Sequence, residues 1–321
     1  MSNKPILLVA GEPNSIFLEI FFKCLKNNYY KSPLIIIASK NLLLKQMALL
    51  GFNYRINLIK ERHINIEKLD NKKINIIDVK YNFKYAFEKI TNKSQPYIDN
   101  CFKIALRILK KNEYIKLING PISKKNFLHG KHHGITEYLA KKTKKNNNVA
   151  MLIYNQKLSV SPITTHLPLK DVSKNITKKK IINHVKLIRS FYKKVLKKDP
   201  KIAITGLNPH CESNFKSSEE KKIIEPAIKA LVKKKNKVYG PFAADTIFMR
   251  EQSKNYDVII GMYHDQVLTP LKSLFGFNAI NITLGLPFTR VSPDHGPNHS
   301  MLGKNLSDPK SLIQALKFLD K

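Results

Sequence analysis

Three histidines in this sequence each follow a short apolar run of the kind that forms a buried strand. The run that includes Ile163 precedes His166, residues 202–204 precede His210, and residues 258–260 precede His264. If these runs are neighbouring parallel strands, the three imidazoles converge at one edge of a sheet. Three neutral imidazoles with an open coordination position are a common way to hold a catalytic divalent metal ion. Any one of them alone is more often an ordinary residue at a strand end.

Two cations and an amide lie downstream of these histidines. Lys272 and Arg290 could clamp a phosphate or carboxylate, since arginine binds such groups bidentately and lysine acts as a point charge. Asn281 begins the run that ends at Arg290 and adds a neutral polar group. The pattern therefore indicates an anion site beside the candidate metal site, although solvated surface cations are the simpler interpretation for Lys272 alone.

The chain is strongly basic, with 57 Lys and Arg against 23 Asp and Glu and a formal charge of +34. Arginine supplies six of these cations, and the lysines are spread along the whole sequence. Proteins that recognise a phosphate backbone favour arginine, whose guanidinium binds phosphate bidentately, together with interleaved aromatic side chains. We therefore expect the lysines to form a solvated surface, and we expect no nucleic-acid partner. A nucleic-acid-binding protein remains an alternative, and it requires DNA affinity that falls steeply with salt.

Length and cysteine usage favour a cytoplasmic enzyme. The 321 residues, 43% of them hydrophobic, are enough for one large or two medium domains. No apolar run reaches the roughly 18 residues of a membrane span, and the apolar stretch near the start is too short for a signal peptide. Three cysteines without CxxC spacing suggest neither a disulfide framework nor a thiolate metal site. We therefore expect no membrane partner.

Strands and helices are expected to alternate along the chain. Apolar runs predict strands at 6–10, 34–38, 74–79 and 115–118, before those that precede the histidines. Helical periodicity predicts helices at 15–26, 41–50, 95–111, 178–196 and 218–233. Alternation of this kind is typical of an α/β fold with mainly parallel sheets, whose ligands bind at the carboxyl ends of the strands.

Seven segments of the sequence form one pattern: GPISK at 120–124, TTHLPL at 164–169, GLNPH at 206–210, AADT at 243–246, MYHDQ at 262–266, NITLGLPFTR at 281–290 and DHG at 294–296. Together they resemble the 4-hydroxythreonine-4-phosphate dehydrogenase family of pyridoxal phosphate biosynthesis. The resemblance extends over nearly the whole chain. Each segment alone is a weak signal, but their order and spacing are highly specific.

The resemblance implies a role for each matching residue. The metal ligands would be His166, His210 and His264, holding one zinc, magnesium or cobalt ion per active site. Substrate contacts would come from Thr136, Lys272, Asn281 and Arg290. Asp245, with Lys272, would act in catalysis, Asp245 either moving a proton or orienting a ligand. His295 and Gly296 would contact NAD(P).

The resemblance also implies an architecture. Two α/β/α domains would surround a cleft, as in isocitrate and isopropylmalate dehydrogenases, which bind NAD without the GxGxxG fingerprint that is also missing after the first strand here. Residues 1–125 plus 291–321 would form the cofactor side, and 126–290 the metal, substrate and dimer side. The family forms homodimers whose active sites take residues from both subunits, so the three histidines need not belong to one chain.

The implied reaction oxidises the small phosphorylated hydroxy-amino acid 4-phosphohydroxy-L-threonine. The metal lowers the pKa of the C3 hydroxyl, Asp245 takes its proton, and hydride leaves to NAD(P). The β-keto acid product then loses CO₂, and the cation stabilises the resulting enolate before it is protonated to 3-amino-2-oxopropyl phosphate.

This sequence departs from the family pattern at four places. Residues 14–17 stand where glycines are usual, Ile135 replaces a substrate-contacting histidine, and segments 211–213 and 297–298 also differ. Two alternatives follow from these changes. One is a related metal- and NAD-dependent dehydrogenase of another hydroxy acid, and the other is a catalytically weakened member retained for binding. The sequence does not choose between NAD and NADP, nor does it identify the metal.

Overall fold

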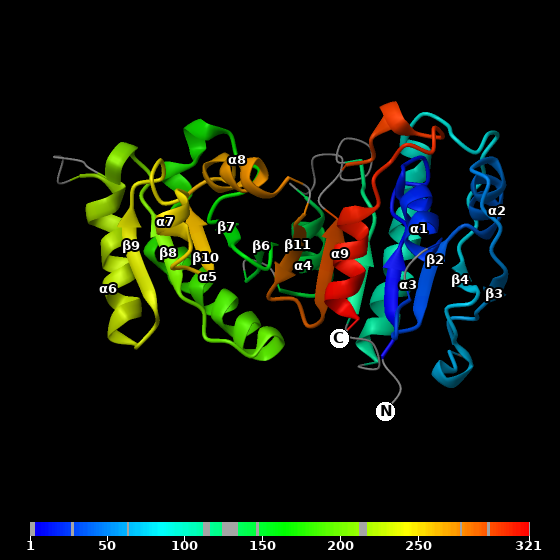
Figure 1. The fold of residues 1–321 in the computed structure, drawn as a ribbon, viewed down its shortest axis with the longest axis horizontal. Coiled ribbons are helices and arrows are strands. Elements are labelled where there is room, and N and C mark those ends of the chain that lie inside the picture. Colours follow the sequence, from blue (N-terminus) through cyan, green and yellow to red (C-terminus); the bar gives the residue numbers. More distant parts are fainter. Residues whose placement is uncertain are drawn as a thin grey trace. The chain divides into compact units, whose positions relative to one another are not determined.

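In the computed structural model, the described residues are 4–26, 29–62, 64–111, 116–123, 134–145, 148–211, 217–276, 278–293 and 296–320. The chain divides into two compact units (Figure 1). The first comprises Met1–Tyr138 with Pro287–Lys321, and the second comprises Leu139–Leu286. The expected division into a cofactor side and a metal side stays a prediction. Among the described residues, no helix is both long and apolar enough to cross a membrane.

The first unit is built on parallel strands in the order β3-β4-β2-β1-β5-β12. The strands are β1 (Ile6–Val9), β2 (Leu34–Ala38), β3 (Ile56–Leu58), β4 (Ile74–Asp78), β5 (Lys116–Asn119) and β12 (Thr289–Pro293). The helices that begin in this unit are α1 (Phe17–Lys26), α2 (Lys40–Leu49), α3 (Gln95–Lys110), α4 (Ile135–Lys142) and α9 (Lys310–Leu319). Strands β1 and β2 are buried along their whole length, as is usual when helices cover a parallel sheet.

The second unit has the strand order β11-β6-β7-β10-β8-β9. The strands are β6 (Ala150–Tyr154), β7 (Ser159–Pro162), β8 (Ile202–Thr205), β9 (Val238–Phe242), β10 (Val258–Gly261) and β11 (Ile280–Leu284). Strands β7, β10, β8 and β9 run parallel, while β6 is antiparallel to both of its neighbours. The helices lying wholly in this unit are α5 (Lys178–Phe191), α6 (Glu225–Lys233), α7 (Arg250–Ser253) and α8 (His264–Phe275). The expected mainly parallel α/β fold is confirmed.

Side chains fill the loop after β1 where the family pattern has glycines. Residues 14–17 are all buried, and the ring of Phe17 is 1% exposed. It packs against Gly120 at the end of β5, where an added Cβ would lie 2.7 Å from the Phe17 ring and 2.3 Å from the carbonyl oxygen of Ala10. Gly120 therefore leaves the space that the phenylalanine occupies.

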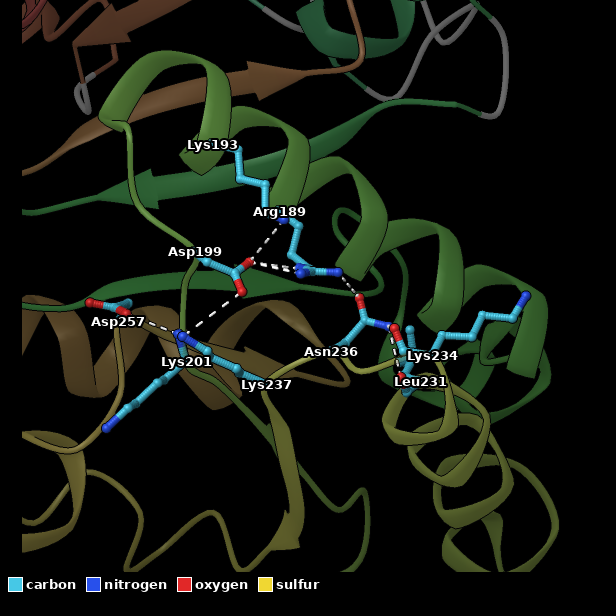
Figure 2. A network of polar contacts seen from close by, with 9 residues as sticks. All are labelled: Arg189, Lys193, Asp199, Lys201, Leu231, Lys234, Asn236, Lys237 and Asp257. Atoms are coloured by element: carbon cyan, nitrogen blue, oxygen red, sulfur yellow. Dashed lines mark hydrogen bonds and ion pairs between the residues drawn. The ribbon is translucent and has the colours of Figure 1, made fainter.

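A charged network holds the amino ends of the parallel strands in the second unit (Figure 2). Asp199, just before β8, accepts hydrogen bonds from Arg189 of α5, at 2.9 Å from its Nε. Arg189 also donates to the side chain of Asn236, which precedes β9. Before β10, Asp257 accepts the backbone N–H of Lys201 at 2.9 Å. The carboxylates at this edge are thus bound by partners within the chain.

Burial alone would raise the pKa of Asp199, but hydrogen bonding and ion pairing bring it below its ordinary value. The guanidinium of Arg189 supplies the main opposing effect, and two lysines add to it. Those lysines are Lys193, at 3.6 Å, and Lys237, at 3.9 Å. The carboxylate is therefore held in its charged form.

Candidate metal and substrate site

The four parallel strands of the second unit each lead to one predicted site residue. Because β7, β10, β8 and β9 are successive neighbours, their carboxyl ends lie at one edge of the sheet. The residues that follow them are His166 after β7, His264 after β10, His210 after β8 and Asp245 after β9. The prediction that the histidine-bearing strands are parallel neighbours is confirmed.

The turns after β7 and β10 are joined, which brings two of the histidines together. Both the N–H and the hydroxyl of Thr164 donate to the carbonyl oxygen of Met262, at 3.1 and 2.7 Å. The imidazole centroids of His166 and His264 lie 5.8 Å apart, with an interplanar angle of 38°. These two rings are therefore neighbours within one chain.

Two of the three histidines have a carboxylate beside Nδ1. Nδ1 of His210 lies 3.4 Å from Oδ2 of Asp245, and Nδ1 of His264 lies 2.7 Å from Oδ1 of Asp265. A carboxylate at Nδ1 favours a proton on that nitrogen and leaves the lone pair of Nε2 free to bind a metal. Metal-binding histidines usually have such a hydrogen-bond acceptor at the nitrogen that does not bind the metal. The His210 side chain is 69% exposed, so a ligand can reach it.

The donor set suits a divalent metal, and two of its imidazoles lie at a suitable separation. Two imidazoles on one tetrahedral ion, with metal–nitrogen distances of about 2.1 Å, have ring centroids about 5 Å apart. The separation of His166 and His264 is close to this value. Among the residues that the structure describes, however, no three His, Cys, Asp or Glu side chains gather tightly enough to hold an ion.

Two predicted substrate residues belong to the same unit. Lys272 is exposed on α8, two turns beyond His264. Asn281 lies on β11 opposite Ile153 of β6. Its Oδ1 atom is buried and has no hydrogen-bond partner among the described residues. A buried acceptor without a donor is costly, so a hydrogen-bond donor on a ligand would stabilise this position.

Arg290 and Thr136 belong to the first unit. Arg290, on β12, is 1% exposed, and its Nε donates to Oδ1 of Asn119 at 2.7 Å. Burial lowers the pKa of Arg290 to about 10, against the opposing effect of the negative charge on Glu137. Thr136 is 8% exposed in the first turn of α4, next to Ile135. A buried guanidinium gains from an anionic ligand, because that ligand replaces lost hydration.

The predicted cofactor residues follow β12. His295 lies outside the described residues. Gly296 is exposed, and a Cβ built there would meet nothing within 4 Å. The next residue, Pro297, accepts a hydrogen bond from the N–H of Ile16 at 3.3 Å, so the altered loops after β1 and β12 contact each other.

Sequence reasoning assigned no role to three polar residues near the histidines: Asp265, Glu220 and Gln266. Asp265 directly follows His264, so its adjacency was a usable signal. Glu220 is 1% exposed and accepts a hydrogen bond from the turn that carries His210. Gln266, in the turn that carries His264, donates a hydrogen bond to Gly206. Such burial is set by tertiary packing and leaves no mark in residue spacing.

Comparison with known sequences gives consistent relatives over the full length. The family profile described as "Pyridoxal phosphate biosynthetic protein PdxA" matches residues 30–319. A 4-hydroxythreonine-4-phosphate dehydrogenase from Sulfurihydrogenibium sp. is 40% identical over 97% of this chain and 96% of its own. The enzyme of that name from Aquifex aeolicus is 32% identical, covering 99% and 98%. A D-threonate 4-phosphate dehydrogenase from Salmonella typhimurium is 28% identical, covering 99% and 98%.

Solved structures agree with the sequence relatives. The 4-hydroxythreonine-4-phosphate dehydrogenase of Klebsiella pneumoniae superposes with a TM-score of 0.84 at 28% identity, covering 99% of this chain and 98% of its own. Isocitrate dehydrogenase from Methylococcus capsulatus has a TM-score of 0.50 at 10% identity over 97% and 83%, which supports the fold alone. From the profile match and the full-length relatives, the chain belongs to the PdxA family of pyridoxal phosphate biosynthetic proteins, a family of dehydrogenases.

Proposed function

We propose that the protein oxidises 4-phosphohydroxy-L-threonine with NAD(P), using a divalent metal, and that the β-keto acid formed decarboxylates to 3-amino-2-oxopropyl phosphate. The observation that carries this proposal is the shared carboxyl edge of β7, β10 and β8, which bears His166, His264 and His210. The names of full-length relatives support the substrate.

His210 and His264 would bind the metal through Nε2, because Nδ1 of each faces a carboxylate, and His166 would be the third ligand. A divalent cation at this place would supply the positive charge that acidifies a substrate hydroxyl and stabilises an enolate. In this proposal, Asp245 is the general base. Its side chain is 53% exposed beside His210, where it can take the hydroxyl proton while the C3 hydride passes to NAD(P).

The remaining predicted residues would bind the anionic groups of the substrate. Lys272 and Arg290 would neutralise phosphate and carboxylate, with Lys272 also steadying the charge that develops during decarboxylation. Asn281 would accept a hydrogen bond from the substrate at its buried Oδ1. Thr136 would donate its hydroxyl to the phosphate. His295 and Gly296 would contact the nicotinamide cofactor.

The test is one assay on the purified protein. NADH formation from 4-phosphohydroxy-L-threonine should be rapid, stop with a chelator and return with Zn²⁺, Co²⁺ or Mg²⁺. The variant Ile135→His, which restores the family residue, should be measured in parallel. A strong rise in its activity would mean that Ile135 marks a changed or impaired substrate site. Turnover that persists in metal-stripped buffer would contradict the metal assignment.

We also propose that the metal site is completed across a homodimer in the cytoplasm. The support is that no three ligands gather among the described residues of one chain, although two imidazoles lie side by side. Pairwise mixtures of the three histidine-to-alanine variants test this. A mixed dimer with one intact site gives about a quarter of wild-type activity after equal mixing. If none of the mixtures recovers activity, all three histidine ligands of each metal site come from one chain.

A second substrate has specific support. The Salmonella typhimurium relative, similar over nearly the whole chain, is named a D-threonate 4-phosphate dehydrogenase, and the substrate-contacting histidine of the pattern is Ile135 here. Both substrates are phosphorylated β-hydroxy acids, so they require the same metal and anion contacts. Measuring kcat/KM for both compounds, with NAD and with NADP, distinguishes the two reactions.

A further inference from the structure

A buried glutamate supports the loop that carries His210. Glu220 is 1% exposed, and its Oε1 accepts the backbone N–H groups of Leu207 and Asn208, at 2.8 and 2.9 Å. Its Oε2 accepts from the side-chain amide of Asn208 at 2.8 Å. These hydrogen bonds fix the backbone two and three residues before His210. Hydrogen bonds to a buried carboxylate are among the stronger ones in proteins.

A glutamine joins this loop to the turn that carries His264. Oε1 of Gln266 accepts from the N–H of Met262 at 2.7 Å and from the hydroxyl of Thr205 at 3.0 Å. Its Nε2 donates to the carbonyl oxygen of Gly206 at 2.8 Å. One side chain, two positions after His264, therefore connects the end of β10 with the end of β8, where its partners lie four and five positions before His210.

Glycines make room for both side chains. A Cβ at Gly206 would lie 3.1 Å from Oε1 of Glu220 and 2.5 Å from the sulfur of Cys211. At Gly261, a Cβ would lie 2.9 Å from Oε1 of Gln266 and 2.4 Å from Val267. The two strand ends are therefore shaped around these polar groups, and neither could carry a larger residue without displacing them.

The imidazole of His210 depends on this support. Its side chain is 69% exposed, so packing does not hold the ring, and its position follows from the backbone of its loop. We propose that Glu220 and Gln266 are positioning residues that fix where the imidazoles of His210 and His264 are each presented to a metal ion. The inference rests on the proposed metal-dependent function. A small displacement of ligating or reacting groups costs far more in rate than in stability.

Two near-isosteric variants test the inference. Glu220→Gln replaces one acceptor oxygen by a donor, which opposes the amide donors of the loop. Gln266→Glu keeps the acceptor for Met262 but removes the donor to Gly206. The matched control is Glu225→Gln, in the same helical segment, where the carboxylate pairs with Lys221 at 3.1 Å on the surface.

One binding readout, one hydrogen-exchange readout and one kinetic readout decide the outcome. Co²⁺ affinity, followed by visible absorption on the metal-free protein, should fall about 10- to 100-fold in both variants and stay unchanged in the control. Hydrogen exchange at the amides of Leu207 and Asn208 should accelerate in Glu220→Gln. The kcat for the phosphorylated hydroxy acid should fall with little change in KM for NAD.

Wild-type Co²⁺ affinity and kcat in Glu220→Gln and Gln266→Glu, even with a lower free energy of unfolding, would overturn the inference and leave the two residues with a purely structural role. If the wild-type protein itself neither binds Co²⁺ nor reduces NAD, the proposed function fails, and the inference fails with it. The two failures are therefore distinguishable from the wild-type measurements alone.

Discussion

The two edges of the parallel strands in the second unit handle charge in opposite ways. At the amino edge, Asp199 and Asp257 receive hydrogen bonds and ion pairs from within the chain, and the pKa of Asp199 is held below its ordinary value (Figure 2). At the carboxyl edge, Asp245 is 53% exposed beside a His210 side chain that is 69% exposed. The first edge satisfies its charges internally, while the second leaves them accessible to a ligand.

This difference follows from the polarity of parallel strands. Loops at the carboxyl ends present side chains towards a common surface, so substitutions there change chemistry with little effect on the core. Residues before the strands anchor the sheet to its helices. We therefore expect substitutions at the carboxyl edge to change activity with small effects on stability, and substitutions at the amino edge to do the reverse.

The largest effect is expected from His210→Ala. Loss of a residue that only hydrogen-bonds to a metal ligand can cost roughly 100-fold in activity. Loss of the metal-binding imidazole itself should lower turnover by more than that. The free energy of unfolding should change by less than about 0.5 kcal/mol, because the side chain is mostly exposed. NADH formation and denaturant unfolding measure the two quantities. A stability loss that accounts for the loss of activity would remove the contrast between the edges.

Acid should destabilise the region between the edges. His184 of α5 is 6% exposed and lies 2.7 Å from the hydroxyl of Ser161 on β7, and burial lowers its pKa from 6.5 to about 3. The unfolded chain takes up this proton near pH 6.5 and the folded one does not. The contribution to stability is therefore complete above pH 6.5 and is lost as the pH falls, by about 1.4 kcal/mol per unit towards pH 3.

Unfolding free energies measured between pH 7 and 4 check this expectation, with His184→Gln predicted to show a flatter dependence than the wild type. His299→Gln, which removes an exposed histidine of the first unit, is the control and should leave the dependence unchanged. Equal slopes in all three proteins would show that His184 does not couple proton uptake to unfolding.

A smaller effect is expected from Asp245→Asn. The amide keeps the shape but loses the negative charge beside Nδ1 of His210, so turnover should fall about 10-fold or more. An unchanged kcat would exclude both a catalytic and an orienting role.

The smallest effect is expected at the amino edge. Asp199→Asn should lower the free energy of unfolding by about 1 kcal/mol, since the ion pairs are partly exposed and solvent screens them, and kcat and KM should remain those of the wild type. Glu251→Gln, which breaks an exposed pair with Lys254 on α7, is the control and should change neither quantity. Loss of activity in Asp199→Asn would show that the edges are coupled.

Much of the fold was predictable, because strands such as β1, β2 and β10 are continuous apolar runs. The short strand β3 and the strand β9, with its Gly-Pro pair, were not predicted. Nor was the antiparallel strand β6. Its turn into β7 uses Asn155, whose Oδ1 accepts the N–H of Lys157 at 2.9 Å and whose Nδ2 donates to the carbonyl oxygen of Asn278 at 2.6 Å. The second of these contacts spans 123 residues, and no local pattern reveals it.

The candidate site was predictable to a similar degree. Strand ends located His166, His210 and His264, because parallel strands place their carboxyl ends together. The supporting carboxylate of Glu220 was not found, since it reaches its loop from a separate helical segment. A sequence pattern can therefore indicate which groups react before it indicates which groups hold them in place.

The contact between Phe17 and Gly120 places unequal limits on the two positions. The carbonyl oxygen of Ala10 would lie 2.3 Å from a Cβ at position 120, so a side chain is excluded there whatever residue occupies position 17. The aromatic ring, in contrast, requires that glycine. The dependence therefore runs in one direction: Phe17 needs glycine at position 120, while position 120 needs glycine with or without Phe17. A loop transplanted from a relative can replace Phe17 if the buried site around it repacks, whereas any side chain at position 120 would collide with backbone.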